Sequence, residues 1–199
     1  MPEALRIIED EHRSLAAVLA GLEAVVGQVE EGRLAEDPAL LVAMVGYLRD
    51  FPERLHHPKE DAHLFRLLRL RAPAIAPVLE ALGEDHLRGA ALVARLEEAV
   101  SAHAAARAPF GAVADAVRAY AELEWAHMRR EEQEVLPAAA RALTEGDWQE
   151  VDAAFRANAN PLAGLGPGAE LRELFRRITA LAPAPLGVGP AGGPSPRGG

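Results

Sequence analysis

The spacing of apolar residues along the chain predicts long amphipathic helices. In the first stretch, apolar residues recur at alternating steps of three and four, and His12 is the one polar member: Leu5, Ile8, His12, Leu15, Leu19, Leu22, Val26 and Val29. A later stretch repeats this pattern around His86: Ile75, Leu79, Leu82, His86, Gly89, Val93, Leu96 and Val100. This period is that of one face of an α-helix.

Alternation of period two is almost absent, so we predict an all-α fold. Start and stop signals indicate four long helices, at about 2–31, 37–71, 74–106 and 109–143. Pro52 and Pro58 fall inside the second helix and Pro137 inside the fourth, where we expect a kink or a local break. Long helices with short connections favour an up-down-up-down four-helix bundle.

The chain divides into three parts. We predict the bundle over residues 1–145 and two short helices, 147–158 and 169–181, packed on it within 146–182. A loop rich in proline and glycine, 160–168, separates these helices. Residues 183–199 offer almost nothing to bury and are expected to form a disordered tail.

Composition narrows the classes of partner. The 199 residues are half hydrophobic, enough for one well-packed domain. A net charge of −9 argues against nucleic acid and anionic membranes as partners. No apolar run approaches the roughly 20 residues of a membrane span, and the N-terminus starts directly with an amphipathic helix, so we expect a cytoplasmic protein. There is no cysteine, so His, Asp or Glu must hold any metal.

In the second and fourth predicted helices, a histidine and a glutamate stand four residues apart: His56 with Glu60, and His127 with Glu131. Residues four apart share one face of a helix. A buried imidazole or carboxylate without a partner costs several kcal/mol, so four helices with polar groups near mid-length point to a shared partner, a metal. The alternative is a polar core that binds no metal. The mixed nitrogen and oxygen set suits iron or manganese better than magnesium or calcium.

The order of these motifs resembles the hemerythrin-like (HHE cation-binding) family over roughly residues 1–145. The matching residues are His12, His56-His57-Pro58-Lys59-Glu60-Asp61 with Leu64-Phe65, Asp85-His86, and His127-Met128-Arg129-Arg130-Glu131-Glu132 with Leu136-Pro137. The resemblance implies a four-helix bundle around a non-haem di-iron centre that binds O2 or responds to O2, NO, peroxide or iron. It implies as ligands His12, His56, Glu60, His86, His127 and Glu131, with Glu60 and Glu131 bridging the two metals beside an oxo or hydroxo group.

The third helix departs from the oxygen-carrying members of that family. Those members place two histidines four apart on this helix, whereas Leu82 and Ala90 flank His86 at that spacing. One imidazole is therefore missing, which argues against simple O2 storage and favours a more open, reactive or sensory centre. His57 can supply a replacement, but it lies about 100° from His56 around an α-helix. We therefore favour a place beside the ligands or at the surface for His57.

Other polar residues receive lesser roles. His63 and Glu134 follow the ligand glutamates on the same faces and are candidates to hydrogen-bond the ligand imidazoles. His103 is expected to be solvated. Glu-x-x-His, the signature of ferritin-like di-iron proteins, also occurs, which we attribute to the abundance of glutamate: Glu9/His12, Glu53/His56, Glu60/His63 and Glu124/His127.

Three functions remain open from the sequence. The first is a protein that binds or senses O2, NO, iron or redox state, and the second is an enzyme that reduces peroxide or nitric oxide. The third is an interaction module with a metal-free polar core. We favour binding or sensing over catalysis, because His57 and His63 are the only obvious proton-transfer residues. The expected partner is a small diatomic or peroxide ligand, and the sequence identifies no protein partner.

Overall fold

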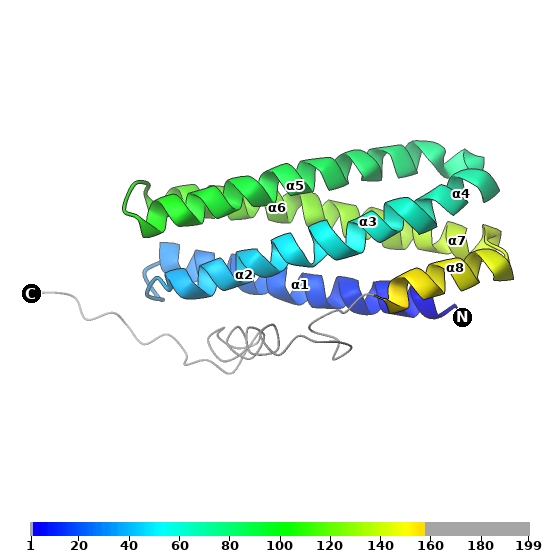
Figure 1. Ribbon diagram of the computed structural model, residues 1–199. Coiled ribbons are helices and arrows are strands. Elements are labelled where there is room, and N and C mark those ends of the chain that lie inside the picture. Colours follow the sequence, from blue (N-terminus) through cyan, green and yellow to red (C-terminus); the bar gives the residue numbers. More distant parts are fainter. Residues whose placement is uncertain (1, 158–199) are drawn as a thin grey trace, which may run out of the picture.

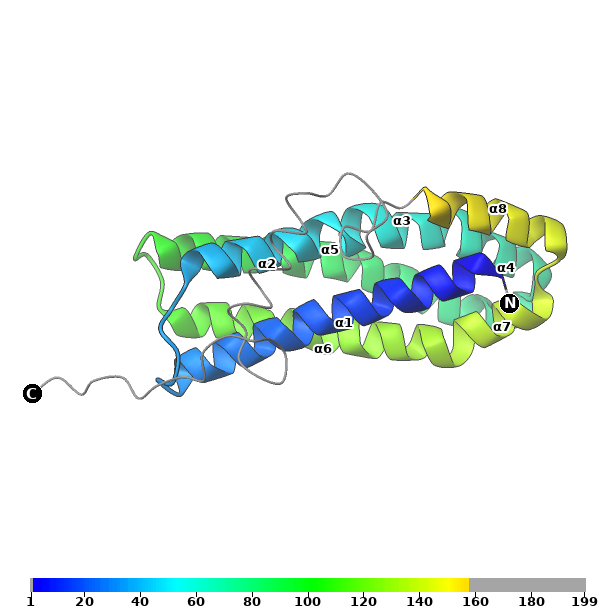
Figure 2. The ribbon, with the colours of Figure 1, turned by 90° about the horizontal axis from the view of Figure 1, so that it is seen from below.

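The computed structural model describes residues 2–157, in which all regular structure is helical and no strand occurs. The first rod is α1 (Glu3–Glu30). The second is an almost continuous series: α2 (Pro38–Asp50), η1 (Pro52–His56), α3 (His57–Lys59), η2 (Glu60–Phe65) and α4 (Arg66–Arg71). The third and fourth rods and a final helix follow: η3 (Pro73–Ile75) with α5 (Ala76–Ala104), then α6 (Phe110–Arg130), η4 (Glu131–Val135) and α7 (Leu136–Ala142), then α8 (Glu145–Arg156). The four rods run up and down side by side (Figures 1 and 2), which confirms the predicted all-α bundle.

Local signals set the helix ends as expected. The side chain of Asp37 accepts a hydrogen bond from the backbone N–H of Leu40 at 3.0 Å, and Pro38 occupies the first helical position. Gly32 has φ of 69°, the left-handed conformation that commonly terminates a helix and that glycine adopts at little cost. This turn directs the chain from α1 into the second rod.

The prolines inside the second and fourth rods lie next to wide π-helical turns instead of breaks. Proline has no N–H, and its ring clashes with the carbonyl four residues earlier, so the regular hydrogen-bond ladder cannot pass through it. In η1, which precedes Pro58, the N–H of His57 bonds to the carbonyl of Pro52, five residues back. In η4, which precedes Pro137, the N–H of Leu136 bonds to the carbonyl of Glu131 in the same way. Such turns fit an extra residue into the helix, which changes the direction of nearby side chains.

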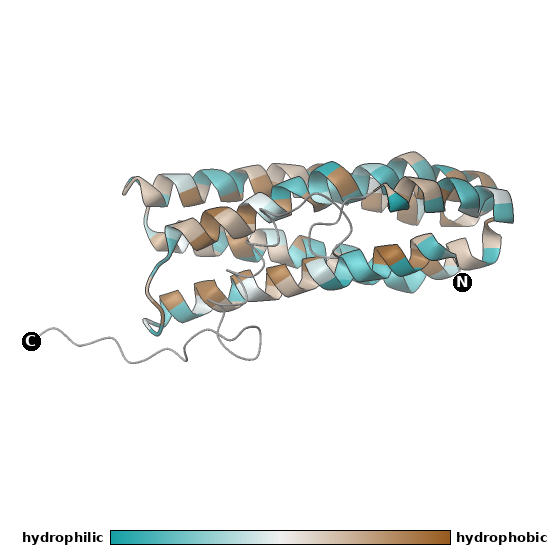
Figure 3. Ribbon diagram, turned by 60° about the horizontal axis from the view of Figure 1, so that its bottom comes forward, coloured by the Kyte–Doolittle hydropathy of each residue, from teal (hydrophilic) through white to brown (hydrophobic). Residues whose placement is uncertain are grey.

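Two apolar clusters fill the bundle, one towards each end. The first packs the second half of α1 against α2, α5 and α6, and contains the buried rings of Tyr47, Phe51 and Tyr120. The second packs the start of α1 against η2, α4, α7 and α8, and includes Phe65 and Trp148. Hydrophobic and hydrophilic residues alternate around the rods (Figure 3). The buried histidines and glutamates lie between the two clusters, so the packing itself encloses a polar layer.

Helix α8 folds back beside the N-terminal end of α1 (Figures 1 and 2). It buries Trp148, Val151 and Phe155 in the second cluster. Asp147 pairs with Arg71, and Asp152 accepts a hydrogen bond from the backbone N–H of Ala4 at 2.7 Å. Helix α8 therefore packs against the bundle. The predicted loop at 160–168, the helix at 169–181 and the tail at 183–199 lie outside the described residues. In residues 2–157, no helix combines the length and the apolar character needed to cross a membrane.

Candidate metal centre

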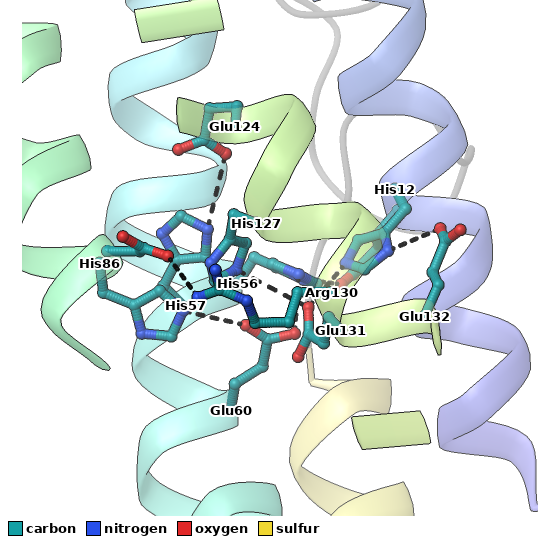
Figure 4. Close-up of polar contacts among 12 residues, drawn as sticks. His12, His56, His57, Glu60, His86, Glu124, His127, Arg130, Glu131 and Glu132 are labelled. Atoms are coloured by element: carbon teal, nitrogen blue, oxygen red, sulfur yellow. Dashed lines mark hydrogen bonds and ion pairs between the residues drawn. The ribbon is translucent and has the colours of Figure 1, made fainter. Parts of the chain in front are cut away.

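The four rods bring all six predicted ligands together in the polar layer. All of them are buried, with 6% exposure or less: His12, His56, Glu60, His86, His127 and Glu131. Figure 4 shows them approaching one another from different helices. The regular α-helical spacing of α1 and α5 accounts for His12 and His86, because each occupies the inward face of its helix. His56, Glu60 and Glu131 stand in the π-helical turns η1, η2 and η4, and His127 stands in the last turn of α6.

A seventh residue, His57, lies with them; of the two places favoured from the sequence, the structure puts His57 beside the predicted ligands and not at the surface. The residue is 4% exposed, and its ring stacks on that of His86 with centroids 4.2 Å apart. The expected 100° separation from His56 assumes a regular α-helix, whereas the π-helical turn that ends at His56 alters the local register. His57 thus brings an imidazole from the second rod beside His86. The signal in the sequence was Pro58, which interrupts the α-helical ladder at this point.

The seven residues form two groups of possible metal ligands. One contains His57, Glu60, His86 and His127, and the other contains His12, His56, Glu60 and Glu131. Within each group the donor atoms all lie within 4.8 Å of one another. Because Glu60 belongs to both groups, its two carboxylate oxygens can reach two neighbouring metal positions. Glu131 also faces both groups, with Oε2 3.2 Å from Nε2 of His12 and 3.7 Å from Nε2 of His127.

The unpaired atoms of these residues fit a bound metal. The Nε2 atoms of four imidazoles and all four carboxylate oxygens are buried without a hydrogen-bond partner in the described structure: His12, His56, His86, His127, Glu60 and Glu131. Buried polar groups in proteins are almost always hydrogen-bonded. So many unsatisfied nitrogen and oxygen atoms at one place form the donor set that metal ions of the iron and manganese type bind.

Carboxylates fix the orientation of three of the imidazoles. The Nδ1 atom of His56 lies 2.7 Å from the carboxylate of Glu11, which is buried. The Nδ1 atom of His12 lies 3.0 Å from Glu132, and the Nδ1 atom of His86 lies 2.9 Å from Asp61. Both of these carboxylates are partly exposed. A carboxylate only accepts hydrogen bonds, so each Nδ1 carries the hydrogen. The opposite nitrogen, Nε2, then presents its lone pair to the centre when the imidazole is neutral.

We did not assign these orienting carboxylates from the sequence. A signal was present, because Asp61 directly follows Glu60 and Glu132 directly follows Glu131. In both cases the second acidic residue points to a histidine on another rod while the first points to the centre. The packing of the rods decides which histidine each of these carboxylates meets, so residue spacing along the sequence does not predict the pairing.

The surroundings shift the pKa of the histidines in opposite directions. Burial lowers the pKa of His12, but the carboxylates of Glu131 and Glu132 outweigh this effect and raise it to about 9. Burial also lowers the pKa of His86, but the carboxylates of Asp61 and Glu60 outweigh this effect and raise it to about 10. Burial dominates at His127 and lowers its pKa to about 3. A metal ion must therefore displace protons from His12 and His86, whereas His127 is already neutral.

The buried carboxylates compete for the same neighbours. Burial raises the pKa of Glu131 to about 7, and repulsion from Glu60 adds to this rise. For Glu60, burial acts in the same direction, but the imidazoles of His56 and His86 outweigh it and hold the pKa well below its usual range. Glu60 is therefore ionised, consistent with its central place between the two groups.

Two glutamates of the pattern that we attributed to chance also enter the core. Glu53 and Glu124 lie beside His57, and the hydroxyl of Tyr120 donates a hydrogen bond to Glu53 at 3.2 Å. Burial raises the pKa of Glu53 to about 7. Burial, followed by repulsion from Glu53, raises the pKa of Glu124 to about 8. Figure 4 shows Glu124 on the side of the centre away from Glu60.

Three lesser expectations were wrong. His63 contacts Glu150 of α8 at 2.9 Å instead of a ligand imidazole, and Glu134 is exposed. His103 is not simply solvated. Its Nδ1 lies 3.1 Å from the carbonyl of Ala108 and its Nε2 lies 2.8 Å from Glu36, so it secures the turn after α5.

Comparison with known proteins agrees with this geometry. The profile of the hemerythrin HHE cation-binding domain matches residues 3–139, and the chain belongs to this family. The match spans all seven residues of the centre and ends before α8. No curated protein and no solved structure matches the chain.

Proposed function

We propose that this protein holds two non-haem iron ions in the polar layer and uses them to bind or sense O2, NO, or iron and redox state. The observation that carries this proposal is the arrangement of seven buried donors in two groups that share Glu60. Five imidazoles and two carboxylates form a donor set that suits iron, with manganese as the alternative. Glu60 and Glu131 are the proposed bridging residues, together with an oxo or hydroxo group.

The chain itself prepares the site for such ions. Ionised Glu60 supplies negative charge, and the hydrogen bonds to Nδ1 of His12, His56 and His86 hold each ring with Nε2 directed inward. The apolar clusters on both sides separate the centre from bulk water. Iron, when bound, supplies a coordination position for a small molecule and reversible electron transfer.

A second candidate is reduction of peroxide. The observation that favours it is the presence of Glu53, Tyr120 and Glu124 beside His57, since these add groups able to exchange hydrogen bonds with a ligand. Turnover distinguishes the two candidates. An enzyme consumes many equivalents of peroxide without losing its absorption spectrum, whereas a binding or sensing protein consumes one equivalent or none.

Metal analysis with an absorption spectrum tests the proposal directly. Protein from cells grown with iron is expected to contain two irons per chain and to absorb as an oxo-bridged or hydroxo-bridged pair. A chain that contains no metal after growth with iron, and takes up none after purification, would instead be an interaction module with a polar core.

A further inference from the structure

A second set of buried polar side chains lies next to His57, on the side opposite Glu60. Glu124 and Tyr120 are buried, and the side chain of Glu53 is 6% exposed. Oε2 of Glu53 lies 3.6 Å from Nδ1 of His57, and Oε2 of Glu124 lies 3.9 Å from its Nε2. We call Glu53 and Glu124 the carboxyl pair. The pair does not belong to either group of metal donors.

A glycine makes room for the carboxyl pair. A Cβ atom at Gly89 of α5 would lie 2.8 Å from Oε1 of Glu53 and 3.2 Å from Oε1 of Glu124. Any other residue at this position would displace both carboxyl groups. Gly83, on the same helix, differs, because a Cβ there would meet only Oδ1 of Asp61 at 3.9 Å, an ordinary contact. The two carboxyl groups thus converge on a notch in α5.

The carboxyl pair is incompletely satisfied. Tyr120 donates to one oxygen of Glu53, but Oε2 of Glu124 and Nδ1 of His57 have no hydrogen-bond partner in the described structure. Leaving a buried carboxyl oxygen unpaired is costly. The other side of the centre differs, because the ring of Phe155 packs against His56 with centroids 6.1 Å apart. On the His57 side, one buried and unpaired carboxyl oxygen, Oε2 of Glu124, thus belongs to neither group of metal donors.

We propose that the carboxyl pair is the wall of the centre that contacts the small ligand, and that it selects ligands carrying an O–H donor, the hydroperoxide class. A carboxyl oxygen accepts a hydrogen bond from such a ligand whether or not the group is ionised. O2 and NO have no hydrogen to donate, so the pair offers them no equivalent contact. This inference rests on the proposed iron centre, and it identifies which of the candidate ligands that centre favours.

Two ligands of similar size separate this role from a general effect on the centre. The full chain is loaded with iron and reduced. Stopped-flow absorption then measures its oxidation by hydrogen peroxide, and an absorption titration measures its affinity for NO. In Glu124→Leu the peroxide rate constant is expected to fall about tenfold, the effect of one lost hydrogen bond, while NO affinity changes less than twofold. Glu124→Gln keeps an acceptor oxygen and is expected to retain most of the rate.

The glycines supply a matched pair of variants in one helix. Gly89→Ala keeps both carboxyl groups but displaces them, so it is expected to slow peroxide and spare NO, as Glu124→Leu does. Gly83→Ala is expected to match the wild type in both measurements. Equal changes for peroxide and NO, no change in Glu124→Leu, or a similar loss in Gly83→Ala would overturn the inference while leaving a two-iron centre standing. A wild-type chain that takes up no iron would overturn the proposed function as well, and iron analysis of each sample tells the two failures apart.

Discussion

Asp61 lies 2.9 Å from Nδ1 of His86, although the residue directly before Asp61 is Glu60, which faces the middle of the centre. Glu132 repeats this relationship in the fourth rod, since it lies 3.0 Å from His12 and follows Glu131. In each pair of consecutive acidic residues, the first side chain thus faces the metal position and the second hydrogen-bonds to a histidine from another helix. This arrangement locks the rods together at the centre and orients the nitrogens that face it.

Glu60→Ala is expected to abolish the paired centre, because Glu60 belongs to both groups of donors. The measured iron content should fall from two ions per chain to fewer than one. Glu131→Ala should also lose the pair, since Glu131 faces His12 and His127. The control is His103→Ala, which removes a histidine bonded to Glu36 and far along α5, and should keep both irons. Retention of two irons in Glu60→Ala would show that the ligand assignment is wrong.

His57→Ala is expected to empty or weaken one of the two metal positions, leaving about one iron per chain. The physical reason is the loss of one imidazole from the group that contains His86 and His127. His63→Ala is the matched control, because His63 lies in the same rod but contacts Glu150 of α8. Equal iron contents in the two variants would place His57 outside the ligand set.

Asp61→Ala and Glu132→Ala are expected to keep two irons but to release them faster. Loss of a carboxylate behind a ligand histidine typically costs about 10-fold to 100-fold in metal affinity. The rate of iron transfer to a chelator measures this effect, with Glu134→Ala as the control because Glu134 is exposed. Unchanged rates in both variants would mean that packing alone orients His86 and His12.

Acidification is expected to destabilise the metal-free protein through His127. Its folded-state pKa of about 3 lies below the usual value of 6.5, so below pH 6.5 the unfolded chain takes up a proton that the folded chain refuses. At pH 5 this lowers the free energy of unfolding by about 2 kcal/mol. Glu53 and Glu124 act in the opposite direction, because their raised pKa values favour the folded state as the pH falls.

The contribution of His127 is therefore measured as a difference. Urea unfolding at pH 7 and pH 5 should show that the wild type loses about 2 kcal/mol more on acidification than His127→Gln does. Identical pH responses in the two proteins would contradict the assigned pKa.

Phe155→Ala is expected to lower the free energy of unfolding by about 3 kcal/mol, the usual cost of removing a buried aromatic ring. Phe155 is fully buried and contacts His56, so iron release should also become faster. Thermal unfolding and chelator competition check the two effects. Leu87→Ala is the control, since Leu87 is 76% exposed. Normal stability and iron release in Phe155→Ala would mean that α8 is not firmly docked.

The sequence by itself determined the helical architecture and which predicted ligands lie on the inward face of each helix. The apolar seam of the third rod coincides with the buried face of α5, from Leu79 to Val100, with His86 and Gly89 in it. His56 and Glu60, four residues apart, both face the core, as do His127 and Glu131. These features follow from spacing within one helix, which obeys a fixed geometry.

The tertiary structure alone decided which side chains meet across helices. His57 turned inward because wide turns beside proline changed the helical register, and a regular α-helix cannot represent that shift. Asp61 and Glu132 met histidines from distant parts of the chain, and Glu53 approached Glu124 at the notch of Gly89. Such contacts depend on the distance and rotation between packed rods. Spacing along one chain segment carries information about neither, because both are set by how all four rods pack at once.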